Sequence, residues 1–256
     1  MRWLDRSLLL AGLLCAFPVC YATEGPGITG DLGAGFSYGP HDPTGVHYQT
    51  QPIPYVDLAW GPVNLSADGG LSWDAFKTND WSIGPFVNYV EGRNASGKLR
   101  GLHDVPDMAE VGGFVEYSPV EYWRVFAELG RAYGGRSRQG GVMGRVGTEV
   151  DYPLGMGIYG GTTVTGHFSD GRQAQTFFGV DAAESRHSGL DQYNASGGLQ
   201  NMSLNQSFRF PLGGNWALLT SATWTRLVNS AEESPIVTDR GNSDQFQADV
   251  AIAYHF

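Results

Sequence analysis

Cysteine is almost missing from this sequence. The chain of 256 residues contains two cysteines, Cys15 and Cys20. Both lie in an N-terminal segment that we expect to be removed, for reasons given in the next paragraph. The remaining chain then has no thiol, which excludes disulfides, thiolate metal sites and a cysteine nucleophile.

Long apolar runs are missing as well. After residue 22 no stretch has about 18 consecutive apolar residues, so no transmembrane helix is expected. The apolar segment "SLLLAGLLCAF" (7–17) is too short to span a bilayer as a helix; it follows two arginines and precedes the small–x–small site Cys20-Tyr21-Ala22. This order predicts a cleaved signal peptide over residues 1–22. An N-terminal anchor helix is the alternative.

Positive charge is scarce. Lys and Arg number 16 against 26 Asp and Glu, giving a net charge of −10. No basic stripe is present, so no nucleic-acid partner is expected. GxSxG, HExxH and P-loop motifs are also absent, and the six histidines do not pair at ligand spacing. We therefore predict no catalytic residue, no cofactor and no metal ligand, and keep a His-plus-carboxylate barrel hydrolase as an alternative.

Glycine and aromatic residues are plentiful, and apolar residues recur with a period of two. The chain has 37 glycines and is 12% aromatic. In the last segment, apolar residues alternate with Gln245, Gln247, Asp249 and His255. Successive side chains of a strand point to opposite faces, so this segment predicts a strand with one apolar face. The same pattern recurs along the chain.

Two features favour a membrane barrel over a soluble sandwich. Trp216 and Trp224 bracket an apolar strand face, at a spacing close to the apolar thickness of an outer membrane. Tight turns also alternate with long polar segments at 94–107, 169–192 and 229–243. We predict an all-β fold: a closed antiparallel transmembrane β-barrel over residues 23–256, embedded in outer-membrane lipid of a Gram-negative bacterium.

The strand count is ambiguous before Trp81. Eleven candidate strands can be counted, but a barrel with both ends on one side needs an even number. "WGPV" (60–63) and "KTND" (77–80) both look like tight turns, and these cannot both be conventional alternating ends. We predict twelve strands, with ten as the alternative. "QTFFGV" (175–180) could form an extra hairpin arm.

Charged residues also fall on the polar faces. They are Arg124, Glu128, Arg145, Glu149, Asp151, Arg209 and Asp249. Such residues can line a pore, but in a small barrel opposite charges more often pair and fill the interior. We expect packing of this second kind.

The end of the chain resembles the sorting signal of bacterial outer-membrane barrels. That signal has an aromatic last residue with apolar residues at every second position before it. Here it would comprise Ala248, Val250, Ile252, Tyr254 and Phe256. The resemblance implies recognition by the barrel assembly machinery; the alternative is an ordinary strand that happens to end there.

Several segments resemble the MipA/OmpV family of outer-membrane proteins. They are "QPIPYVDLAWG" (51–61), "NDWSIGPFVNYVEGR" (79–93), "KLRGLHDVPDMAEVG" (98–112), "QTFFGVDAAESRHSGLDQYNASGGL" (175–199) and "SPIVTDRGNSDQ" (234–245). The resemblance implies a non-enzymatic barrel, in one branch a scaffold joining a lytic murein transglycosylase to a penicillin-binding murein synthase. Other branches imply adhesion, osmotic response or antibiotic sensing, so a small-solute or antibiotic-binding channel or sensor, or an adhesin, is the alternative.

Opposite charges in the long loops suggest a shared external surface. The candidate residues are Arg100, Asp104, Asp107, Arg186, Asp191, Asp239 and Arg240. Loops that pack on each other through such charges would form a fixed surface. Solvated rim charges are the alternative.

Overall fold

The computed structural model describes residues 27–134 and 139–256. The predicted signal peptide, 1–22, lies outside the described residues. The strands are β1 Thr29–Pro40, β2 Tyr48–Trp60, β3 Val63–Ser66, β4 Gly70–Trp73, β5 Phe76–Lys77, β6 Trp81–Val90, β7 Met108–Val120, β8 Trp123–Tyr133, β9 Val142–Gly155, β10 Ile158–Ser169, β11 Gly198–Gly213, β12 Trp216–Leu227 and β13 Asp244–His255. The helices are η1 Gly97–Leu99, α1 Gly171–Phe178, α2 Ala182–Ser188, α3 Asn229–Glu232 and α4 Pro235–Arg240.

The strands form one closed antiparallel barrel. β1 pairs with β13, and β4 pairs with β6, which joins the two ends of the sheet. β5 is a two-residue strand beside β6 in a turn, so the wall has twelve strands. The predicted all-β transmembrane barrel and its strand number are confirmed. No described helix has the length and apolar character needed to cross a membrane.

A short hairpin explains the ambiguity before Trp81. β3 and β4 have four residues each and pair with each other, with the chain reversing at 67–69. The apolar alternation over 63–74 is therefore two short strands. The tight turns before and after this hairpin therefore both lie at the same end of the barrel, where β2 ends and β6 begins. The hairpin adds two strands to the wall, so the strand number stays even.

The two faces of each strand follow the alternation in the sequence. On β13, Val250 and Ile252 are 44% and 50% exposed on the outside, whereas Ala251 and Ala253 are buried inside. Exposed aromatic residues lie near both ends of the outer face. Those near the long loops include Tyr38, Tyr48, Tyr89, Tyr133 and Trp224, and those near the short turns include Trp60, Trp73, Trp81, Trp216 and Phe256. Two such belts mark the two interfaces of a membrane.

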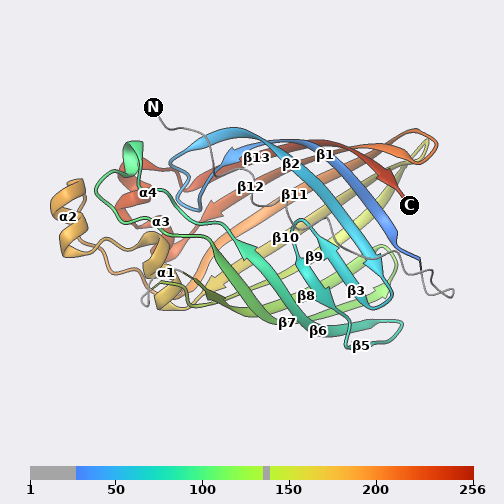
Figure 1. Ribbon diagram of the computed structural model, residues 1–256, viewed down its shortest axis with the longest axis horizontal. Coiled ribbons are helices and arrows are strands. Elements are labelled where there is room, and N and C mark those ends of the chain that lie inside the picture. The colour runs from blue at the N-terminus through green and yellow to red at the C-terminus, as the bar shows by residue number, and fades with distance from the viewer. Residues whose placement is uncertain (1–26, 135–138) are drawn as a thin grey trace, which may run out of the picture.

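The barrel has two different ends (Figure 1). All the helices lie at one end, here called the loop end, and the last strand finishes at the other, here called the turn end. At the turn end the Phe256 N–H donates to the Gly30 carbonyl at 2.9 Å. The Tyr254 ring lies 5.1 Å from Trp216 and 5.2 Å from Phe256, centroid to centroid. Phe256 thus extends the aromatic belt of the turn end.

We predict that a charge on the outer face destabilises the barrel far more than a charge change inside. Val250→Arg places a cation in the apolar band and should lower the free energy of unfolding by about 2–4 kcal/mol. Asp249→Asn, one residue away and facing inward, should have a smaller effect because Ser221 and Gln247 still offer hydrogen bonds. Denaturant titration in lipid vesicles measures both, and the reverse order would contradict the assignment of faces.

We also predict that assembly depends on the aromatic ring of Phe256. Deleting this residue should reduce folded barrel in the outer membrane and leave aggregate in the periplasm. Phe256→Tyr, which keeps a ring, is the matched control and should assemble normally. Heat-modifiable mobility of the envelope fraction measures folded barrel; normal levels after the deletion would refute the sorting-signal hypothesis.

Candidate functional site

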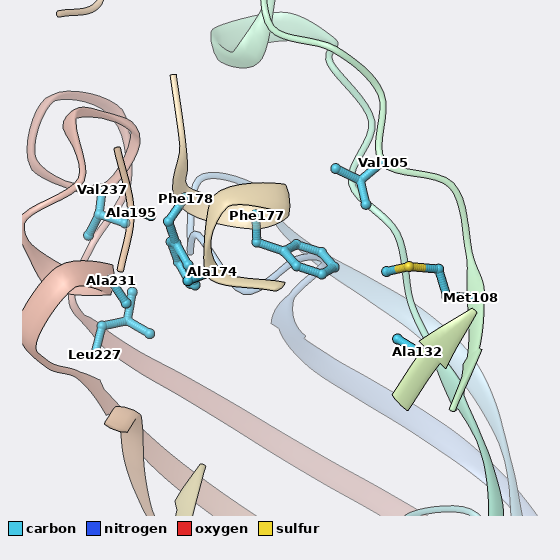
Figure 2. Packing of buried hydrophobic residues seen from close by; sticks show 10 residues of the cluster. All are labelled: Val105, Met108, Ala132, Ala174, Phe177, Phe178, Ala195, Leu227, Ala231 and Val237. Atoms are coloured by element: carbon cyan, nitrogen blue, oxygen red, sulfur yellow. The ribbon is translucent and has the colours of Figure 1, made fainter. Parts of the chain in front are cut away.

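The long loops fold into a compact layer over the loop end. We call this layer the outer cap; it comprises 41–47, 91–107, 170–197 and 228–243. Its largest apolar cluster joins three of these loops to the strand ends, as Figure 2 shows. Phe177 points toward Val105 and Met108, and Phe178 lies on the side of Ala231 and Val237. Buried side chains from separate loops make the cap a small core outside the membrane span.

A second apolar cluster connects the first loop, 41–47, to the other cap loops. Val46 packs there with Leu99, Leu102, Val180, Leu190 and Ile236. Leu99 and Ile236 have no exposed surface. The sequence offers no sign of a role for Val46, because one valine between Gly45 and His47 has no periodicity that could reveal it.

Local capping explains why the cap contains helices. Asp170 accepts a hydrogen bond from the Gln173 N–H and begins α1, and Asp181 and Glu184 form a capping box on α2. Ser234 caps α4, with Pro235 at its first position. The hairpin arm suggested for "QTFFGV" (175–180) is wrong, since most of it belongs to α1.

A buried arginine lies at the centre of the cap. Arg93 is 1% exposed, and its guanidinium donates to the carbonyls of Phe177 and His103. Burial lowers the pKa of Arg93, and the negative charges of Asp42, Glu184 and Asp104 oppose that effect. Nothing in the sequence marks Arg93 as buried, because a single arginine after a strand looks like a solvated charge.

Glu184 connects the cap helices to the loop before β7. Its carboxylate accepts hydrogen bonds from the His103 ring, the His103 N–H and the Asp181 N–H. Burial would raise the pKa of Glu184, but these hydrogen bonds outweigh it and lower the pKa to about 2. The ionised carboxylate is therefore part of the folded cap.

The seven predicted surface residues do lie on the cap, but not as ion pairs. Within the described residues no salt bridge joins any two of them. Arg240 instead donates to the carbonyls of Lys98 and Ser188, which joins α4 to two other loops. Asp104 and Asp107 accept backbone N–H groups within their own loop. The side chains of Arg100, Arg186, Asp191 and Asp239 are exposed.

Inside the barrel, opposite charges pair as expected. Arg124 contacts Glu149 at 2.6 Å and Glu116 at 2.8 Å. Arg145 contacts Glu128 at 2.7 Å, and Arg209 contacts Asp31 at 2.5 Å. These pairs fix the arginine side chains against the wall.

The turn of the β3–β4 hairpin lies inside the lumen. A Cβ placed on Gly69 would lie 3.9 Å from Arg145 Nη2, and β9, which carries Arg145, is distant from β3 and β4 in the strand order. Asn88 Nδ2 donates to the Asp68 carbonyl at 3.0 Å, which fixes the turn to β6. The hairpin thus narrows the lumen below the cap.

A cavity of about 660 Å³ occupies the turn-end part of the lumen. Its lining includes Tyr55, Asp151, Arg209 and Asp249 from the strands, and Glu121 from a short turn. Among the described residues, no three His, Cys, Asp or Glu side chains gather as a metal site would require. The arrangement offers polar binding groups rather than a paired nucleophile and base.

A family model decides the identity of the chain. The model of MltA-interacting protein MipA matches residues 32–256. The chain belongs to this family. The predicted family is therefore confirmed, and the barrel is an outer-membrane protein. Since short turns face the periplasm and long loops face outward in such barrels, we expect the loop end outside the cell and the turn end in the periplasm. No curated protein matches the chain in sequence.

Solved barrels resemble the chain at low sequence identity. The NanC porin is 8% identical with a TM-score of 0.49, covering 88% of this chain and 99% of the porin. OprG from Pseudomonas aeruginosa is 11% identical with a TM-score of 0.28, covering 91% and 97%. Ail of Yersinia pestis is 11% identical with a TM-score of 0.21, covering 91% and 100%.

We predict that the MipA-family cap loosens in acid through Glu184. Since the pKa of Glu184 is lowered from 4.5 to about 2, its contribution to stability is full above pH 4.5 and is lost as the pH falls toward 2. Glu184→Gln should remove this pH dependence and make the cap easier to cleave at pH 7. Protease accessibility of segments 91–107 and 170–197 measures this, with Glu233→Gln, an exposed cap residue, as the matched control. Equal protection of both variants would contradict the role of Glu184.

Proposed function

We propose that this protein is a non-enzymatic scaffold of the outer membrane that binds murein-remodelling enzymes in the periplasm. The partners would be a lytic murein transglycosylase and a penicillin-binding murein synthase. The family supports the first partner, because its model is named for an interaction with MltA. The second partner and the scaffold role rest on the family resemblance.

The observation that supports this proposal best is the contrast between the two ends of the barrel. The cap covers the outer mouth with two apolar clusters and the buried Arg93. The cavity, in contrast, reaches a periplasmic turn, because Glu121 and Tyr122 belong to its lining while its other lining residues lie on the strands. A partner in the periplasm would therefore meet the open end of the barrel.

The turn end also carries exposed apolar side chains. In its turns Met156 is 90% and Tyr122 60% exposed, and at the ends of β9 and β11 Leu154 and Leu212 are 54% and 56% exposed. Met156 has a φ of 52°, an unfavourable conformation for methionine, between Gly155 and Gly157. A methionine in a strained turn that buries almost none of its surface against the barrel favours a role in contact with a partner.

Passive conduction, the main alternative, is less well supported. The cap covers the outer mouth, and the β3–β4 turn and the paired arginines occupy the lumen below it. A pore for free solutes would need these groups to move together.

The test is retention of purified partners by the detergent-solubilised, immobilised barrel. We expect wild type to retain both a lytic murein transglycosylase and a murein synthase, and Met156→Asn with Leu154→Ser to retain at least five-fold less. Asparagine suits a positive φ, so the turn should be kept or slightly stabilised, by up to about 1 kcal/mol. Asp239→Asn, in the outer cap, is the matched control and should bind normally. Failure of folded wild type to retain either enzyme would refute the scaffold.

A further inference from the structure

The barrel wall is incomplete between β2 and β6. β3 pairs with β2 only at Asp57–Trp60, and β4 pairs with β6 only at Phe86 and Val87. Beyond the hairpin, residues 48–55 of β2 have no paired neighbour on this side among the described residues. Figure 1 shows β3 ending well short of the far end of β2.

The unpaired edge of β2 has few hydrogen-bond donors. The Val56 carbonyl accepts from the Ala67 N–H, so the backbone groups of Val56 face the hairpin. By alternation those of Pro54, Pro52 and Thr50 face the same side, beyond the hairpin. Proline has no N–H, so this edge offers carbonyls and few donors, which disfavours pairing with another strand.

The edge of β6 that faces β2 also disfavours pairing with another strand. The backbone groups of Val87 on β6 point toward β4. By alternation the backbone N–H of Tyr89 points to the same side, where no strand is paired with it. The Asn88 side chain accepts this N–H at 2.8 Å. Nearer the loop end, His41 Nδ1, in the loop before β2, lies 3.0 Å from Glu91 Oε1, just after β6, and this contact joins the two loops. The opening is thus framed by β2, β6, the hairpin turn and this contact.

The opening lies at the level of the outer leaflet. Tyr48 and Tyr89, at its upper corners, belong to the aromatic belt near the long loops, so residues 50–55 lie within the apolar band. Carbonyls at this depth need donors, and an open strand edge is tolerated only where it lines water. The side chains of Gln49 and Gln51 bond to each other and share the strand face of Tyr55, which lines the cavity, so they face the lumen here. The opening is therefore polar on its inner side and in contact with lipid on its outer side.

The lumen behind the opening is acidic. Its arginines Arg124, Arg145 and Arg209 are all paired with carboxylates. Asp57, on β2 itself, is exposed and has no salt bridge within the described residues. Asp249 and Asp151 of the cavity likewise have no cationic partner there. A positive head group would find more carboxylates than competing cations.

We propose that this opening is a lateral portal that admits the head group of a cationic amphiphile from the outer leaflet into the acidic lumen, while the apolar tail stays in the membrane. The paired strands elsewhere in the wall offer no such route. The prolines keep the portal open, because they prevent β2 from recruiting another strand.

Single cysteines with a bimane fluorophore test the portal, since residues 23–256 contain no cysteine. Gln51→Cys faces the lumen at the portal, Thr163→Cys faces the lumen in a fully paired wall, and Val250→Cys faces lipid. In vesicles of phosphatidylcholine brominated on its acyl chains, we expect quenching at 51 and 250 and at least three-fold less at 163. Quenching at 51 no greater than at 163 would overturn the portal.

Charge selection is tested with the same probes in unbrominated vesicles. A long-chain alkyltrimethylammonium and an alkyl sulfate of equal length, each brominated on the tail near the head group, are added in turn. We expect the quenching at 51, divided by that at 250, to be at least three-fold higher for the cation. Asp57→Asn should reduce this preference and Asp239→Asn, in the cap, should not. Equal ratios for the two amphiphiles would overturn the selection of cations.

Discussion

Satisfaction of backbone hydrogen bonds is the constraint on which this structure depends. In hydrocarbon an unpaired N–H or C=O costs several kcal/mol, so strands can cross a membrane only if the sheet closes. Closure here runs through β13 with β1 and through β4 with β6. The second junction is only two residue pairs long. Above it, Pro52 and Pro54 remove donors from β2, and Asn88 satisfies the N–H of Tyr89.

The outer cap lies outside the membrane span and is stabilised in the same way as the core of a soluble protein. Its loops cannot rely on the bilayer, so they bury side chains such as Phe177 and Ile236 against each other and cap short helices with Asp170, Asp181 and Ser234. Arg93 and Glu184 then connect these loops by hydrogen bonds to backbone groups. The result closes the outer mouth, while the lumen has its cavity beside the periplasmic turns.

The sequence predicted the wall better than the cap, for physical reasons. A strand between lipid and lumen must alternate, so the faces of Val250 and Asp249 could be assigned from their positions alone. The β3–β4 hairpin was harder to predict. Its apolar residues Leu65, Ala67 and Leu71 all have odd numbers, so the alternation continues across the turn as it would in one long strand. The cap residues Val46 and Arg93 depend on contacts between distant loops, which no local pattern records. The family match was predictable because it spans whole segments such as 175–199.

Single-barrel conductance in a planar bilayer tests the central claim, that the cap closes the outer mouth, most directly. The folded barrel, with its cap intact and heat-modifiable mobility checked, should give no stable conductance steps above the bare bilayer at either polarity. Steady, reproducible steps from the wild-type protein would mean that solutes pass through the cap and the hairpin, and would contradict a barrel that opens toward the periplasm and is closed outside.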